Sequence, residues 1–238
     1  MIVILGNVNS YQSLGTKDGP GIRFVVFMQG CPKRCIWCHN PETLSFKEAI
    51  SVSSSELCDK IARCKPYFKN GGGVTFTGGE PLCQSEFLCE IIPMLQEKGI
   101  HVAIETAGVT LNENVVKCLE IADLVMFDIK AFSEEKYSRL CSSRYSEAIN
   151  FLDTLQSLNK EVLLRYLIVE GHTDSVENLT SLKEIEKNYS CIKKVELLGF
   201  RKLGLEKYEK LGLPFLLTDT PETTQDKLKK YKDIYNTL

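Results

Sequence analysis

The sequence lacks every feature that would place it in or across a membrane. No apolar run reaches the length of a bilayer span, and the first six residues have neither the length nor the basic lead-in of a signal peptide. It also lacks a surplus of charge, because 29 Lys and Arg oppose 31 Asp and Glu for a formal net charge of −2. The broad basic field typical of nucleic-acid-binding proteins is therefore absent. We expect a cytoplasmic protein with no membrane partner and no nucleic-acid partner.

Linkers and repeats are lacking as well. No Gly-, Pro- or Ser-rich stretch, charge block or low-complexity tract divides the 238 residues. Hydrophobic residues make up 43% of the chain, which is enough for one buried core. We therefore expect a single domain over residues 1–238, and a monomer.

Cysteine is present in unexpected number. The chain has 10 cysteines although disulfides rarely persist in a reducing compartment. Three of them, Cys31, Cys35 and Cys38, fall within eight residues. The others are scattered, and we interpret them as small buried hydrophobic residues: Cys58, Cys64, Cys83, Cys89, Cys118, Cys141 and Cys191.

Short apolar runs alternate with amphipathic stretches along the chain. Runs rich in Val, Ile, Leu and Phe predict six strands, at residues 23–29, 74–77, 101–105, 124–130, 161–169 and 194–198. Helical spacing and capping residues predict helices at 53–67, 86–98, 113–121, 145–158, 175–189, 205–211 and 221–236. Ser53 and Glu56 have the spacing of a capping box, and Ser85, Asn112 and Ser175 are candidate N-caps.

The alternation of strands and helices predicts a parallel sheet covered by helices, as an open sheet or a barrel. Six units are too few for an eight-fold barrel. In either architecture the chemistry collects at the carboxyl ends of the strands. Polar residues and glycines follow the expected strands at these positions: 30–40, 78–81, 105–108, 128–130, 170–172 and 199–201.

Three thiolates at spacings of four and three residues can converge on zinc, copper(I) or an iron–sulfur cluster. A closed zinc site and an electron-transfer cluster each require four protein ligands. His39 adjoins Cys38 and fits the fourth position poorly, so Cys58 or Cys64 is the better candidate. If neither completes the set, one iron of a four-iron cluster is open to an external ligand, and the site is catalytic.

The pattern Cys31-x-x-x-Cys35-x-x-Cys38, with Trp37 before the third cysteine, resembles the signature of the radical S-adenosylmethionine (SAM) superfamily. Residues 18–23, Asp-Gly-Pro-Gly-Ile-Arg, and 78–80, Gly-Gly-Glu, make the chain similar to glycyl-radical-enzyme activases of the pyruvate formate-lyase type. The resemblance covers nearly the whole chain. Residues 39–52 contain no cysteine, so the ferredoxin-like insert of other activases is absent.

The resemblance implies a partial (β/α)6 TIM-like barrel with parallel strands and outer helices. It implies an oxidoreductase whose [4Fe–4S] cluster is held by Cys31, Cys35 and Cys38, with SAM on the open iron. One electron from a reduced flavodoxin or ferredoxin cleaves SAM. The 5′-deoxyadenosyl radical then removes a glycine Cα hydrogen from a glycyl radical enzyme of the pyruvate formate-lyase type.

The resemblance also implies roles for individual residues. SAM contacts are expected from Trp37, Gly78, Gly79, Glu80, Glu105, Thr106, Asp128, Lys130, Arg165 and Arg201. Glu105, Thr106 and Asp128 could also hold a monovalent cation. We expect Asp18, Gly19, Pro20, Gly21 and Arg23 to face the substrate, and His39 to support the cluster by a hydrogen bond.

Two positions depart from the family pattern. Arg201 replaces a histidine, and 105–108 reads Glu-Thr-Ala-Gly where Asp-Thr-Asn-Gly is expected. Two other functions stay open. One is a radical SAM enzyme that acts on a small molecule or peptide, and the other is a metal-binding or electron-carrier protein with a closed site.

Overall fold

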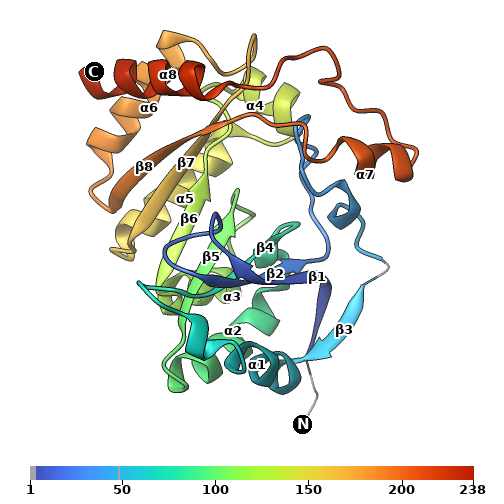
Figure 1. Cartoon of the computed structure of the whole chain (residues 1–238). Helices are drawn as coiled ribbons and strands as arrows, with labels where there is room; N and C mark the ends of the chain where they lie inside the picture. Colours follow the sequence, from blue (N-terminus) through green and yellow to red (C-terminus); the bar gives the residue numbers. More distant parts are fainter. Residues whose placement is uncertain (1–3, 48) are drawn as a thin grey trace.

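The structure is a computed structural model that describes residues 4–47 and 49–238. Its strands form one sheet with the order β3-β1-β2-β4-β5-β6-β7-β8 (Figure 1). In the described residues the sheet is unclosed, with β3 at one end and β8 at the other. The strands are β1 (Leu5–Gly15), β2 (Arg23–Met28), β3 (Ile50–Ser53), β4 (Gly73–Gly78), β5 (His101–Thr106), β6 (Leu124–Asp128), β7 (Val162–Ile168) and β8 (Ile192–Gly199).

All six expected strands are present and pair in parallel, from β2 through β4, β5, β6 and β7 to β8. This confirms the partial, barrel-like α/β fold. Strand β6 ends at Asp128, two residues earlier than expected. Because parallel strands run in one direction, all of their carboxyl ends lie on the same rim.

Two strands were not expected. β1 pairs with β2 and with β3, antiparallel in both cases, and extends the sheet at one edge. β1 reads as a polar segment, Leu-Gly-Asn-Val-Asn-Ser-Tyr-Gln-Ser-Leu-Gly, and most of its side chains are exposed or half-buried. β3 has only four residues. Neither segment has the apolar pattern on which strand prediction depends.

The helices are α1 (Ser54–Ala62), α2 (Ser85–Glu97), α3 (Glu113–Ile121), α4 (Glu134–Cys141), α5 (Tyr145–Ser157), α6 (Val176–Asn188), α7 (Leu205–Lys210) and α8 (Gln225–Thr237). The expected helix at 53–67 ends at Ala62 and is followed by a 3-10 turn at Lys65–Tyr67. α2 includes Ser85, so the predicted N-cap was wrong. α8 begins after Thr224, whose hydroxyl accepts a hydrogen bond from the Lys227 amide.

Helix α4 was missed by the sequence analysis. Its eight residues are mostly polar, and only Tyr137, Leu140 and Cys141 are buried. The Ser133 hydroxyl caps its first turn by accepting from the Lys136 amide at 3.2 Å. A short polar helix gives little hydrophobic periodicity, although its cap is readable in the sequence.

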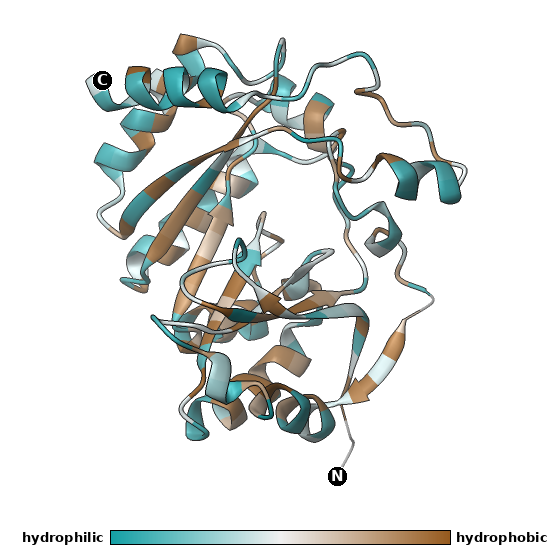
Figure 2. Ribbon diagram, in the orientation of Figure 1, coloured by the Kyte–Doolittle hydropathy of each residue, from teal (hydrophilic) through white to brown (hydrophobic). Residues whose placement is uncertain are grey.

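Side chains alternate between the two faces of the parallel strands. One face contributes fully buried side chains to the main core: Phe76, Ile104, Val125, Phe127 and Leu164. Figure 2 shows hydrophobic residues along β6 and β7, whereas α8 is mainly hydrophilic. The opposite face of the strands carries a small apolar cluster of Ala103, Met126 and Leu163. Nearer the carboxyl ends, the same strands carry the polar side chains of Glu105, Asp128 and Arg165. No helix in the described ranges has both the length and the apolar character needed to cross a membrane.

The capping box of α1 is confirmed, because Ser53 accepts from the Glu56 amide and Glu56 accepts from the Ser53 amide. We predict that Ser53→Ala lowers the free energy of unfolding by about 1 kcal/mol through loss of this cap. Denaturant unfolding measures the change. Ser181→Ala, inside α6, is the control and is expected to have little effect. Equal losses in both variants would contradict the assignment.

Candidate active site

The loop after β2 carries the cysteine motif and is held by backbone hydrogen bonds. The Gly30 amide donates to Thr43 O at 2.8 Å, and the Glu80 amide donates to Gly30 O at 2.8 Å. This contact requires glycine at position 79, because a Cβ there would lie 2.3 Å from Gly30 O. The Gly-Gly-Glu turn therefore packs directly against the start of the cysteine loop.

An inner cavity of about 280 Å³ opens at the carboxyl ends of the strands. It is lined by the loop after β2 and by the ends of β4, β5, β6 and β7. Most of the residues singled out from the sequence meet here: Asp18, Cys31, Cys35, Trp37, Cys38, His39, Gly78, Gly79, Glu80, Glu105, Thr106, Asp128, Lys130 and Arg165.

The three cysteines lie at one end of the inner cavity and are all half-buried. Burial raises the pKa of Cys31 to about 12 and that of Cys38 to about 11. The neighbouring Cys141 side chain lowers the pKa of Cys35 to about 7, aided by the nearby ammonium groups of Lys130 and Lys33. Cys35 is therefore the most readily ionised thiol of the three.

No group of three His, Cys, Asp or Glu side chains in the described residues could hold a single metal ion. A [4Fe–4S] cluster does not require such convergence, because each cysteine binds a different iron. Cys58 and Cys64, the candidates for a fourth ligand, do not line the inner cavity. Among the other cysteines, Cys118, Cys141 and Cys191 are buried, but Cys83 is exposed, so its interpretation as a buried residue was wrong.

An ion-pair network crosses the inner cavity. The Arg165 guanidinium pairs with Glu105 and, at 3.3 Å, with Glu196, and it also donates to Lys17 O at 3.0 Å. Thr77 donates to the second oxygen of Glu105 at 2.8 Å. Burial raises the pKa of Glu105, and Arg165 opposes this effect. Both oxygens of Glu105 are engaged, and a monovalent cation beside it stays a prediction.

Lys130 lies nearer the cysteines. Its ammonium donates to Asp128 at 3.0 Å, and both side chains are largely buried. Burial disfavours the ammonium, but the charges of Asp128 and Cys35 outweigh it and hold the pKa of Lys130 above its ordinary value. Lys130 is therefore a permanent positive charge beside the cysteine loop.

Glu80 is buried, and its oxygens are already hydrogen-bonded. One oxygen accepts from the Thr106 hydroxyl at 2.7 Å and from the Leu82 amide at 3.2 Å, and the other accepts from the Ala107 amide at 3.0 Å. These bonds tie the end of β4 to the end of β5. Glu80 thus orders this part of the cavity wall in addition to any contact with a ligand.

Several expected site residues lie outside the inner cavity. Arg23 is fully buried at the start of β2, where its guanidinium donates to Pro20 O at 3.1 Å and Gly71 O at 3.2 Å. Arg23 can therefore affect a substrate only by shaping the turn at 18–21. The Arg201 side chain is exposed and pairs with Glu222 at 2.9 Å. Its carbonyl lies 2.8 Å from His39 Nε2, so Arg201 fixes the imidazole through its backbone.

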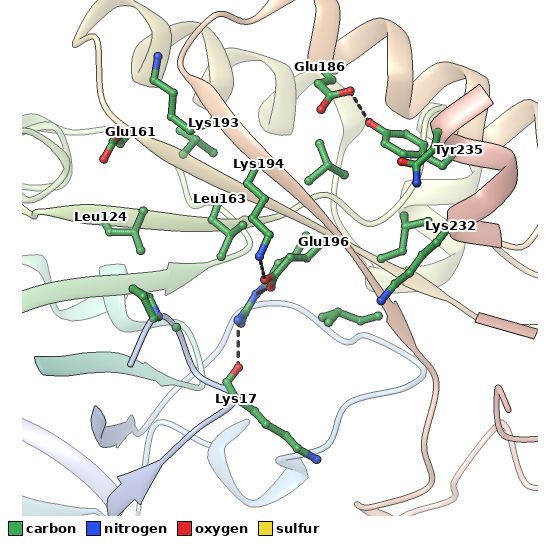
Figure 3. A pocket seen from close by; sticks show the side chains of 18 of the residues that line it. Lys17, Leu124, Glu161, Leu163, Glu186, Lys193, Lys194, Glu196, Lys232 and Tyr235 are labelled. Atoms are coloured by element: carbon green, nitrogen blue, oxygen red, sulfur yellow. Dashed lines mark hydrogen bonds and ion pairs between the residues drawn. The ribbon is translucent and has the colours of Figure 1, made fainter. Parts of the chain in front are cut away.

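A second cavity, the side cleft, has a volume of about 970 Å³ and lies at the open edge of the sheet (Figure 3). Its walls are strand β8, the turn at residues 16–20, which includes Gly19 and Pro20, and the end of α8. Arg165 and Leu198 line both the side cleft and the inner cavity, so the two adjoin. The sequence analysis did not identify this cleft, because its walls come from segments far apart in the chain.

The radical SAM superfamily model matches residues 25–182. This range contains the cysteine motif, the Gly-Gly-Glu turn and Arg165, which are the parts that build the inner cavity. The fold and the site thus define the class of protein, and the chain belongs to the radical SAM superfamily.

Two relatives define the family within this class. The chain is 42% identical over 229 residues to the pyruvate formate-lyase-activating enzyme of Clostridium pasteurianum, which covers 96% of each chain. It is 34% identical over 235 residues to the enzyme of that name from Staphylococcus aureus, covering 95% of this chain and 94% of the relative. The chain belongs to the pyruvate formate-lyase-activating enzyme family, which makes it an oxidoreductase and a glycyl-radical activase.

Solved structures agree on the fold. A domain of a pyruvate-formate lyase-activating enzyme from Bacteroides vulgatus superposes with a TM-score of 0.57 at 19% identity, over 70% of this chain and 94% of that one. Streptococcus suis SuiB, bound to its precursor peptide SuiA, superposes with a TM-score of 0.66 at 16% identity, over 87% of this chain and 44% of that one.

Membership of this family establishes the cofactors as a [4Fe–4S] cluster and SAM. The residues present fit both groups. Three soft thiols line one end of the inner cavity, and the backbone of Gly78 and Gly79 lines it as well. The buried ammonium of Lys130 offers a counter-charge.

The Arg165–Glu105 pair is buried, with side-chain exposures of 6% and 18%. We predict that Arg165→Met lowers the free energy of unfolding by about 3–5 kcal/mol, because it leaves a buried carboxylate without its partner. The double variant Arg165→Met/Glu105→Gln is expected to recover part of this loss. Denaturant unfolding of the cofactor-free protein measures all variants.

Arg144→Met is the matched control, because Arg144 forms an exposed ion pair with Glu147 and its side chain is 71% exposed. Loss of this exposed ion pair is expected to have little effect on the free energy of unfolding. Equal losses in the free energy of unfolding for Arg144→Met and Arg165→Met would show that the buried Arg165–Glu105 pair is no more stabilising than an exposed one.

Proposed function

We propose that the chain installs a glycyl radical on pyruvate formate-lyase. This proposal is carried by the similarity of the chain, along nearly its whole length, to two pyruvate formate-lyase-activating enzymes, at 42% and 34% identity. The protein substrate is then a glycyl radical enzyme, and the reaction takes a hydrogen atom from a glycine Cα in another chain.

The cluster ligands in this proposal are Cys31, Cys35 and Cys38, whose spacing places three thiols on one loop at the inner cavity. With three ligands, one iron is open to the amino and carboxylate groups of SAM. Lys130 is the proposed partner of the SAM carboxylate, because among the described residues its ammonium pairs with one carboxylate, that of Asp128, at 3.0 Å. Arg165 already has two acidic partners and holds the cavity wall.

We assign the remaining contacts to SAM from the positions of the residues that line the inner cavity. Gly78 and Gly79 present backbone groups toward the SAM amino group, which Glu80 supports. Thr106 and Asp128 offer oxygens to the rest of SAM, and Trp37 forms an apolar wall. When bound, the cluster and SAM supply the radical that removes the glycine hydrogen. The chain orients this chemistry and keeps water from it.

We propose that the glycine-bearing segment of the partner enters through the side cleft. The side cleft adjoins the inner cavity at Arg165 and Leu198, so a segment there reaches the cofactor from the side. β8 is an edge strand, and edge strands have unpaired backbone groups that can bind an extended segment. Gly19 and Pro20 form the opposite wall.

Three further expectations belong to the proposal. The electron donor is a reduced flavodoxin or ferredoxin, because the chain has no second cluster motif. The protein works in an oxygen-poor cytoplasm, because an open iron site is oxygen-sensitive. It acts as a monomer that meets its partner transiently.

We predict that Cys35→Ala abolishes cluster binding and SAM cleavage, because it removes one of the three proposed cluster ligands. Iron and sulfide content, electron paramagnetic resonance (EPR) and 5′-deoxyadenosine formation measure the loss. Cys58→Ala, a buried cysteine on α1, is the matched control and is expected to retain both. Retained iron and turnover in Cys35→Ala would refute the ligand assignment.

The partner itself is tested with purified pyruvate formate-lyase. The expected result is a glycine-centred radical signal in its EPR spectrum after incubation with the reduced enzyme and SAM. SAM cleavage without this signal would instead favour a small-molecule or peptide substrate. A cluster spectrum that does not change when SAM is added would favour a closed metal site.

The side cleft is tested with Lys194→Trp. Lys194 lines the side cleft, its side chain is 68% exposed, and it pairs with Glu196 at 2.8 Å. We predict that the larger indole obstructs the partner segment and lowers the rate of glycyl-radical formation by about tenfold, which corresponds to about 1.4 kcal/mol in the barrier. SAM cleavage without the partner should remain unchanged.

Lys229→Trp is the matched control, because Lys229 is 77% exposed and pairs with Asp233 at 3.1 Å on α8, outside the side cleft. Its rate of glycyl-radical formation is expected to equal that of the parent chain. A normal rate in Lys194→Trp would refute entry along this wall.

A further inference from the structure

Two cysteines outside the cysteine loop face each other on neighbouring helices. Cys89 lies in α2 and Cys118 in α3, and their sulfur atoms are 3.1 Å apart. The two helices pack against each other (Figure 1). The bonded distance in a disulfide is about 2.05 Å, so a side-chain movement of about 1 Å would join these sulfurs.

Hydrogen bonds hold both thiols in this arrangement. Cys89 Sγ donates to Asn114 O at 3.3 Å, and Cys118 Sγ donates to Ser85 O at 3.1 Å. Each accepting carbonyl lies on the opposite helix, four residues before the other cysteine. The bonds are therefore reciprocal, and they direct both side chains across the contact between the helices.

The two thiols differ in their access to solvent. Cys89 is half-buried, whereas Cys118 is fully buried, with 0% exposure. Burial also raises the pKa of Cys118, which keeps this thiol protonated. A small oxidant in solution therefore meets Cys89 first, and Cys118 lies within reach of an oxidised Cys89.

We propose that Cys89 and Cys118 form an oxidation site at which hydrogen peroxide converts the two thiols into a disulfide. Peroxide oxidises Cys89 to a sulfenic acid and releases one water. The Cys118 sulfur then attacks the Cys89 sulfur, and the sulfenic hydroxyl leaves with the Cys118 proton as a second water. The thiols lose two electrons and two protons, and the O–O bond of peroxide is reduced. This inference does not depend on the proposed function.

The disulfide would brace one wall of the inner cavity from outside. α2 follows β4 and the Gly-Gly-Glu turn, and α3 follows β5. Glu80 already connects the ends of these strands through Thr106 and the Ala107 amide. The new bond would connect the helices that follow the strands and close a loop of about 30 residues, which restricts the unfolded chain and stabilises the fold.

The site is tested by peptide mapping of the cluster-reconstituted full chain after treatment with hydrogen peroxide. Remaining thiols are alkylated, and trypsin then releases Cys89 in peptide 70–98 and Cys118 in peptide 118–130. The expected product is a linked pair of these peptides whose mass is about 2 Da below their sum, because two hydrogens are lost. Dithiothreitol is expected to separate them.

Cys83 provides the matched control, because it is exposed and lies in the same tryptic peptide as Cys89. Cys83→Ser is expected to keep the linked peptides, and Cys89→Ser is expected to lose them. The reverse result would overturn the inference, because Cys83 would then be the partner of Cys118. Oxidation of Cys83 without any linked peptides in the parent chain would also overturn it.

Urea unfolding of the cofactor-free full chain tests the effect on stability. Oxidation is expected to raise the midpoint of the parent chain by about 1 M relative to Cys89→Ser treated in the same way, each chain being compared with its own reduced form. Dithiothreitol is expected to remove the difference. An equal change in both chains would show that the disulfide does not brace the fold.

Discussion

The guanidinium of Arg165 joins the segments that surround the inner cavity. It pairs with Glu105 on β5 and Glu196 on β8, and it donates to Lys17 O in the turn after β1. The sheet is unclosed in the described residues, so no strand pairing joins β8 to the β1 side. A buried cation requires nearby acceptors. Arg165 therefore holds the open side of the sheet around the site that the cofactors occupy.

The cysteine loop depends on a second set of tertiary contacts. Gly30 and Gly79 meet through their backbones, so the Gly-Gly-Glu turn and the cysteine motif form one wall. The other side of the loop packs on the end of α4, where Arg34 and Ile36 donate to backbone carbonyls. A loop held on both sides can present its thiols without a cofactor to order it, which reduces the cost of binding one.

Much of the fold was predictable because it has a periodic signal. The six parallel strands are apolar runs, and α3 lies between Asn112 and Ile121 as its cap indicates. Strands β1 and β3 and helix α4 were missed because they are polar or short, and their stability comes from partners distant in sequence. Arg201 was assigned to the site by position in a motif, but its side chain pairs with Glu222 at the surface.

By itself the sequence determined the chemistry. The spacing of Cys31, Cys35 and Cys38 and the order of motifs after each strand identify a radical SAM protein, because those signals are local. Only the tertiary structure decided what surrounds them. Cys141 is a small core residue, as its sequence context indicated, but only the fold brings its backbone carbonyl to Arg34 in the cysteine loop. The side cleft likewise forms where β8 faces the turn at 16–20. Such contacts join residues far apart in the chain, so no local pattern records them.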